Sequence, residues 1–281
     1  MSDHTSREHP LLDSKTADLV TRTPELAEVF ESLGINYCCD GDRPLREALA
    51  EGGLHPTEFL TLVQKSLETR PASQPSGPDR PDSDVTSLAG TGPSAEGLIL
   101  NGLAIPEPAC SKVNWASSSL GALVDHILAT HHRYLKSELV LLKFVLQRVA
   151  AAHGSVYGDL YELARVFDRF KTRMENRITQ QEIILFPWCR EIEKSRSHSR
   201  IPADAVQSAS RELETESLAA SRDLSAMRRL TAGFSPPSNA CAAHRTSFQR
   251  LAELERDTHH HVHEELHVLL PRAIALQTSA V

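Results

Sequence analysis

Histidine and glutamate residues in this sequence are spaced so that they could bind a metal ion. His261 and Glu265 are four residues apart, which places both side chains on one face of a helix. One imidazole and one carboxylate suit a borderline metal such as iron, manganese or zinc, and His132 completes the two-histidine, one-carboxylate set of mononuclear non-haem iron sites. The alternative is a metal-free polar layer in which His261 pairs with Glu265, and Arg177 bonds to Glu265 or Gln181.

Two adjacent cysteines, Cys38 and Cys39, are the second candidate for chemistry. They lie in a loop at residues 35–41, beside Asp40 and Asp42. Acidic neighbours raise a thiol pKa, whereas the N-terminus of a nearby helix lowers it. One interpretation is a soft ligand or redox pair that meets iron, nitric oxide or the cluster of a partner protein. The other is two small buried side chains, because free cysteine often packs in this way.

Four long helical patterns would position the candidate metal residues. Each has an apolar seam at alternating spacings of three and four residues, and breaks at residues 154–155, 199–202 and 233–237 separate the patterns. This arrangement predicts an up-down four-helix bundle over residues 116–277. Polar residues interrupt the seams at six positions: His132, Arg177, Gln181, Ser217, His261 and Glu265. Burying them costs free energy unless they are paired or bind a metal. The other histidines near His261 (His259, His260, His263 and His267) are expected to be solvated surface residues or adventitious metal binders.

The N-terminal part of the chain predicts a small helical domain over residues 11–69. Thr23–Pro24 begins one helix, which Gly34 ends. Pro44 and Pro56 begin two more. Residues 70–115 are rich in proline, glycine and serine, which predicts a flexible linker. The expected fold class is therefore all-α, with a small helical domain, a long linker and a four-helix bundle.

Composition narrows the classes of function. The 281 residues carry a net charge of −7, which argues against a nucleic-acid-binding protein. No apolar run reaches the roughly 18 residues of a membrane helix, and the polar N-terminus lacks the apolar region of a secretory signal. The five cysteines do not form a disulfide framework. We expect a cytoplasmic protein with neither nucleic-acid nor membrane partners.

Several motifs resemble the iron–sulfur cluster repair family. Residues 35–41 (Ile-Asn-Tyr-Cys-Cys-Asp-Gly) resemble the Cys-Cys signature of its N-terminal domain. Residues 125–132, 184–187 and 261–273 resemble parts of its hemerythrin-like bundle, which holds a non-haem di-iron centre. The resemblance covers about residues 14–69 and 118–275. It implies a role in nitrosative or oxidative stress, with iron–sulfur proteins as clients.

The family's iron ligands are four histidines and two bridging glutamates. The resemblance assigns ligand positions to His132, His261 and Glu265, with His131 as an alternative on the first helix. The other three ligand positions are substituted, and they hold Arg177, Gln181 and Ser217.

These substitutions argue against a complete di-iron centre. Arginine has no lone pair to donate, and an amide binds iron weakly. Arg177 is expected to replace the charge of one iron and to pair with Glu265. Two outcomes stay open for the three remaining ligands: one metal ion, most simply iron, or none. A rearranged dinuclear site would draw on His126, His131 or Glu182.

The leading functional hypothesis is a cytoplasmic, iron-binding protein of the cluster-repair type, in which Cys38 and Cys39 exchange metal or nitric oxide. The alternative is a metal-free regulatory or interaction module on a degenerate hemerythrin-like bundle. A mononuclear non-haem iron enzyme is a third hypothesis, but the sequence carries no signal for a substrate pocket, and we do not expect a conventional enzyme. The linker is long enough for the cysteine loop to meet the bundle, within one chain or across a homodimer.

Overall fold

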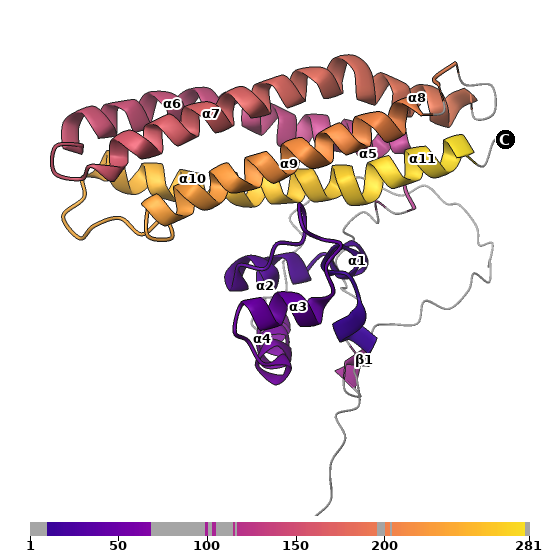
Figure 1. Ribbon diagram of the computed structural model, residues 1–281, viewed down its shortest axis with the longest axis horizontal. Helices are drawn as coiled ribbons and strands as arrows, with labels where there is room; N and C mark the ends of the chain where they lie inside the picture. The colour runs from indigo at the N-terminus through magenta and orange to yellow at the C-terminus, as the bar shows by residue number, and fades with distance from the viewer. Residues whose placement is uncertain are drawn as a thin grey trace, which may run out of the picture.

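The computed structural model describes residues 10–68, 99–100, 103–104, 115, 117–195, 200–202 and 204–278. A four-helix bundle and a smaller helical unit make up these residues, apart from one hairpin, and Figure 1 shows the small unit lying against one side of the bundle. The hairpin pairs β1 (Ile99–Leu100) with β2 (Leu103–Ala104) in antiparallel register. The predicted all-α class is confirmed. The predicted linker at 70–115 lies outside the described residues apart from these strands and residue 115.

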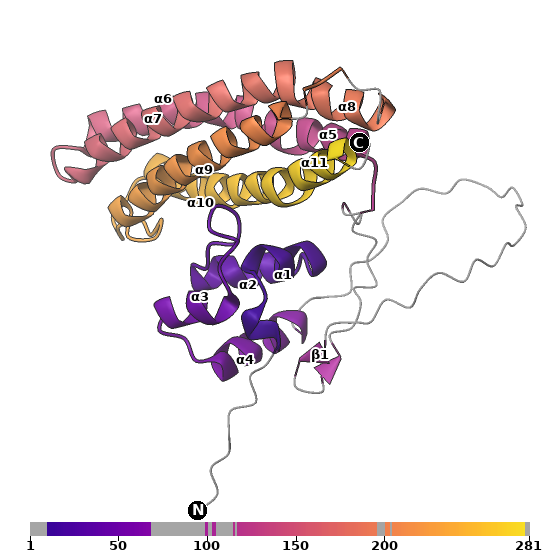
Figure 2. The same cartoon turned by 45° about the vertical axis from the view of Figure 1, so that its right-hand side comes forward.

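Three of the four bundle helices contain a π-helical turn, in which hydrogen bonds run from residue i to i+5. Figure 2 shows the four helices running side by side. In chain order they are α5 (Leu120–Ile127), η2 (Leu128–His132) and α6 (Arg133–His153); α7 (Asp159–Gln180), η3 (Gln181–Leu185) and α8 (Phe186–Ser195); α9 (Ala205–Leu230); and α10 (Ala242–His263), η5 (Glu264–Leu269) and α11 (Leu270–Thr278).

The predicted seams face the interior of the bundle. Every seam position is buried except Leu128, which is half-buried. The apolar side chains divide into two clusters. One includes Leu135, Phe170 and Met174, and the other includes Ile127 and Leu185. Because the polar seam residues fall between these positions on their helices, they separate the two apolar clusters. Among the described residues, no helix combines the length and apolar character that crossing a bilayer requires.

The small unit consists of short helices, three of which follow the predicted signals. Gly34 ends one helix in the left-handed conformation, with φ 68°, which glycine adopts without steric cost. The unit's core continues into the bundle, because Phe30 and Tyr37 share an apolar cluster with Val262 and Leu266. The elements are η1 (Pro10–Asp13), α1 (Thr16–Arg22), α2 (Leu26–Leu33), α3 (Leu45–Glu51) and α4 (Pro56–Glu68).

Packing of the small unit buries histidines that were expected on the surface. His263 is 5% exposed, and its Nε2 lies 3.2 Å from the Thr21 hydroxyl of α1. His259 Nδ1 lies 2.7 Å from a carboxylate oxygen of Glu31 in α2. The expectation of a solvated histidine face is therefore wrong. The apolar pattern of the fourth helix accounts for its packing in the bundle, but not for the additional unit that covers its outer side.

Candidate metal centre

Six polar side chains meet in the middle of the bundle, and we call them the polar layer. Each of the four helices contributes at least one, and all six are at most 1% exposed. The π turns η2, η3 and η5 contribute one residue each, at points where regular α-helix is interrupted. Such turns are frequent at functional sites. The members are His132, Arg177, Gln181, Ser217, His261 and Glu265.

The Arg177 guanidinium forms the centre of the hydrogen-bond network in the polar layer. Its Nε and Nη2 both donate to Glu265 Oε2, with an Nε–Oε2 distance of 3.2 Å. Its Nη1 donates to Ser217 Oγ at 2.7 Å and to the Leu213 carbonyl at 3.3 Å. The other carboxylate oxygen of Glu265 accepts from Gln181 Nε2. The expected Arg177–Glu265 pair is thus present, and it balances the buried positive charge.

His132 and His261 face each other beside this ion pair. Their Nε2 atoms are 3.2 Å apart, and His132 Nδ1 lies 2.9 Å from Glu182 Oε1. Burial lowers the pKa of His132, and burial with the nearby His132 and Arg177 holds the pKa of His261 well below its usual range. Both imidazoles are therefore neutral near pH 7, which is the state that ligates metals. His261 Nδ1 has no hydrogen-bond partner within the described part of the chain.

The donor set fits one ion better than two. Two nitrogens that bind one ion at about 2.1 Å and a near-right angle lie roughly 3 Å apart, which is close to the His132–His261 separation of 3.2 Å. A di-iron centre does not fit, because a cationic guanidinium holds Glu265 and donates to Ser217. Any ion on the two imidazoles would have to compete with Arg177 for the Glu265 carboxylate.

His131, the alternative residue on the first helix, lies outside the polar layer. Its Nδ1 is 2.8 Å from Asp257 Oδ1, and its Nε2 is 3.5 Å from Glu264 Oε2. Its ring stacks on that of His261 with centroids 5.6 Å apart. The sequence did not identify Glu264 as a candidate, because a strict α-helical period assigns only Glu265 to the inward face.

The Cys38–Cys39 loop reaches the polar layer from outside the bundle. The Cys39 thiol donates to the Ser217 carbonyl at 3.4 Å and accepts from the Cys38 thiol at 3.5 Å. Asn36 Oδ1 holds the loop by accepting from the backbone N–H groups of Cys38 and Cys39 at 3.2 and 3.0 Å. His267 Nε2 also lies 2.6 Å from the Cys38 carbonyl. Figure 1 shows this loop rising from the small unit to the bundle.

The two thiols differ in acidity. Burial raises the pKa of Cys38, which is 1% exposed. The hydrogen bond from Cys38 lowers the pKa of Cys39; burial opposes this effect, whereas the charges of His259 and Arg177 add to it. The expected causes, acidic neighbours and a helix N-terminus, are not the main ones. Cys39 is therefore the thiol that ionises more readily.

Comparisons with known proteins identify the class of this fold and site. Residues 123–273 match the hemerythrin HHE cation binding domain, and residues 12–66 match ScdA_N, a domain of unknown function. The chain belongs to the hemerythrin HHE cation binding family and carries an ScdA_N domain before the bundle.

The similarity to individual proteins extends over nearly the whole chain. The sequence is 26% identical to the iron–sulfur cluster repair protein ScdA of Staphylococcus haemolyticus, over 92% of this chain and 96% of that protein. It is 25% identical to the iron–sulfur cluster repair protein YtfE of Edwardsiella ictaluri, over 96% of this chain and 98% of that protein. A probable iron–sulfur cluster repair protein of Haemophilus influenzae is 20% identical over 92% of this chain.

Proposed function

We propose that this chain is a cytoplasmic iron–sulfur cluster repair protein that acts on iron–sulfur client proteins under nitrosative or oxidative stress. The position of Cys39 is the observation that carries the proposal, because its thiol donates at 3.4 Å to the main-chain carbonyl of Ser217, whose side chain belongs to the polar layer. Similarity to repair proteins over more than nine-tenths of the chain supports it. In this proposal residues 11–69 form the cysteine domain, 70–115 the linker and 116–277 the bundle.

Cys38 and Cys39 act as the exchange site in this proposal. Ionised Cys39 offers a sulfur lone pair to iron, including iron that carries nitric oxide, and Cys38 stabilises the thiolate by donating a hydrogen bond. The nearby positive charges of Arg177 and His259 stabilise the same thiolate. A thiolate is a soft ligand, which suits the sulfur-bound iron of an iron–sulfur cluster.

The bundle contributes a site for a single iron ion in place of a di-iron centre. His132 and His261 would hold a single ion through their facing Nε2 atoms, and Glu265, which Arg177 and Gln181 now hold, would have to move toward the ion to become the third ligand. When bound, the ion supplies a positive centre with coordination positions open to exchange. Arg177 and Gln181 compete with that ion for Glu265, which favours weak binding.

Metal content and repair activity together test the proposal. The anaerobically purified protein is expected to carry at most about one iron per chain in the polar layer, counted as the iron that His261→Ala loses, and to reactivate a client enzyme whose [4Fe–4S] cluster has been damaged by nitric oxide. Cys39→Ser is expected to abolish reactivation, whereas Cys241→Ser, a thiol that caps α10, is the control and retains it. Two irons per chain that are both lost in His261→Ala would overturn the single-ion site, because both would then lie in the polar layer, and full reactivation by Cys39→Ser would overturn the cysteine role.

A metal-free interaction module is the second candidate, and the Arg177–Glu265 pair favours it. The pair neutralises the polar layer without any ion. A variant with Arg177→Met, His261→Leu and Glu265→Leu removes the charges together, so that none is left buried alone. If repair activity survives in this variant, the polar layer is not needed for it, and the function depends on the cysteine domain and an apolar bundle. Loss of activity in a folded variant assigns a role to the layer.

A further inference from the structure

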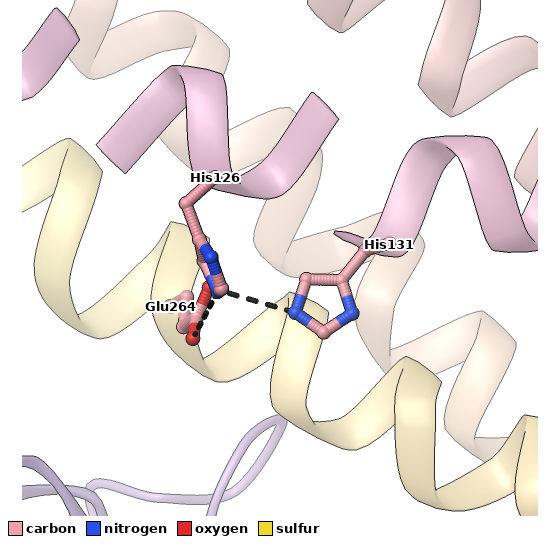
Figure 3. A group of neighbouring side chains, drawn as sticks. All are labelled: His126, His131 and Glu264. Atoms are coloured by element: carbon pink, nitrogen blue, oxygen red, sulfur yellow. Dashed lines mark ion pairs between the residues drawn. The ribbon is translucent and has the colours of Figure 1, made fainter. Parts of the chain in front are cut away.

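A second group of possible metal ligands lies beside the polar layer, and we call it the outer site. It consists of His126, His131 and Glu264, whose ligand atoms lie within 4.8 Å of one another. Figure 3 shows the three side chains converging from α5, η2 and η5. Glu264 Oε1 is 3.4 Å from His126 Nε2, and Glu264 Oε2 is 3.5 Å from His131 Nε2. Within the described residues, no other three histidines, cysteines or carboxylates converge so closely.

Neighbouring side chains orient both imidazoles for metal binding. His131 Nδ1 donates to Asp257 Oδ1 at 2.8 Å, and His126 Nδ1 lies 3.3 Å from Thr130 Oγ1. These contacts engage the Nδ1 atoms and direct both Nε2 atoms to Glu264. A metal-ligating histidine almost always has such a partner on its second nitrogen, commonly a carboxylate.

The local helix geometry explains why these residues converge. His126 and His131 are five residues apart, a spacing that separates side chains on a regular α-helix. The π turn η2 (Leu128–His132) has i to i+5 hydrogen bonds, which bring residues five apart toward one face. Glu264 begins the π turn η5 on the opposite helix. The π turns η2 and η5 therefore each contribute one residue to the outer site and one to the polar layer.

The charge and shape of the outer site suit a divalent transition metal. Glu264 places a carboxylate between the two imidazole rings, with Oε1 facing His126 Nε2 and Oε2 facing His131 Nε2. A divalent cation would balance this carboxylate, and imidazole with carboxylate is a donor set that transition metals take. Ligand atoms at about 2.1 Å in tetrahedral geometry are about 3.4 Å apart, and the three residues here each offer one ligand atom within 4.8 Å of the others.

We propose that His126, His131 and Glu264 bind one divalent transition-metal ion, with Asp257 positioning His131. Two imidazoles and one carboxylate leave a further coordination position for water or a ligand, as in open metal sites. The outer site shares no ligand with the polar layer, although His131 stacks on His261. The proposal therefore does not depend on the single-ion site in the polar layer.

Titration of the chelator-treated full-length protein with zinc, against a chromophoric competitor, tests this inference. We expect about one tightly bound zinc per chain. Glu264→Gln and His126→Ala are expected to weaken that binding by at least 100-fold, and Asp257→Asn by about 10–100-fold. Cobalt substitution should give the visible spectrum of a four-coordinate ion in the wild type and not in Glu264→Gln.

Two controls separate the outer site from other histidines. His55→Ala removes an exposed histidine of the small unit and should leave zinc affinity unchanged. His261→Ala removes a polar-layer ligand and should leave the outer-site zinc bound. The inference is overturned if Glu264→Gln and His126→Ala bind zinc as tightly as the wild type, or if His261→Ala alone removes the tight zinc. It is also overturned if the wild type binds no zinc, in which case the three residues form only a proton-linked ion-pair cluster.

Discussion

The buried Arg177–Glu265 ion pair makes a prediction about stability that requires no bound metal. Both side chains are at most 1% exposed, so removing either charge leaves the other buried without its partner. Breaking a buried pair in this way costs about 3–5 kcal/mol, and each kcal/mol lowers the melting temperature of a domain of this size by about 2–4 °C. We expect Arg177→Met and Glu265→Leu each to lower the melting temperature of chelator-treated protein by roughly 6–20 °C.

A double variant separates the cost of the unpaired charge from lost packing. Replacing both partners with apolar side chains is often neutral or stabilising, so Arg177→Met with Glu265→Leu should melt above either single variant. The double-mutant cycle should give a coupling of at least about 2 kcal/mol. The exposed Lys143–Asp168 pair is the matched control, and Lys143→Met should change stability by no more than about 1 kcal/mol. Additive effects of the two single variants, or effects as small as the control's, would refute the reasoning.

If residues 177, 181 and 217 occupy the ligand positions that the family resemblance assigns to them, placing iron ligands there should add about one iron to the bundle, measured by plasma mass spectrometry; wild-type stoichiometry in the folded variant would contradict this. The variant combines Arg177→His, Gln181→Glu and Ser217→His. At pH 7, iodoacetamide should modify Cys39 before Cys38, because a lowered pKa raises the thiolate fraction of Cys39 below pH 9. His259→Gln should shift the pH dependence of the Cys39 alkylation rate to higher pH. Equal alkylation rates for the two thiols, measured by peptide mass spectrometry, would contradict the difference in acidity. Gly41→Ala should destabilise the protein by about 1–3 kcal/mol in urea unfolding, because its Cβ would overlap the loop backbone; a neutral effect would show that the loop yields. Gly158→Ala is the control, with open space around the added Cβ, and should change stability by no more than about 0.5 kcal/mol.

The periodicity of the sequence predicts most of the bundle and much of the polar layer. Apolar seams identify the inward faces because each helix must bury one stripe, and polar residues on those stripes are conspicuous because their burial is costly. That reasoning predicted that Arg177 and Glu265 would pair, and the structure contains this ion pair. The metal-binding role assigned to His132, His261 and Glu265 stays a prediction.

Two features of the structure could not be predicted from regular helical periods. Glu264 was not identified because η5 is a π turn, whose position depends on hydrogen bonds that residue types do not specify. The burial of His263 and the half-burial of His259 were missed because the small unit covers them. The contact that buries each of them is with a residue more than 200 positions away in the chain, and no local pattern encodes such a contact.

The fixed charge of Arg177 determines where exchange chemistry could take place in this chain. A guanidinium neither leaves its site nor changes its oxidation state, so the polar layer cannot release it as it would release an ion. Two groups proposed for exchange border that layer: the Cys39 thiol, in contact with the Ser217 carbonyl, and the outer site, in contact with His261 through the His131 ring. Because the charge of Arg177 lowers the pKa of Cys39, the fixed arginine also favours the thiolate that would carry out the proposed exchange.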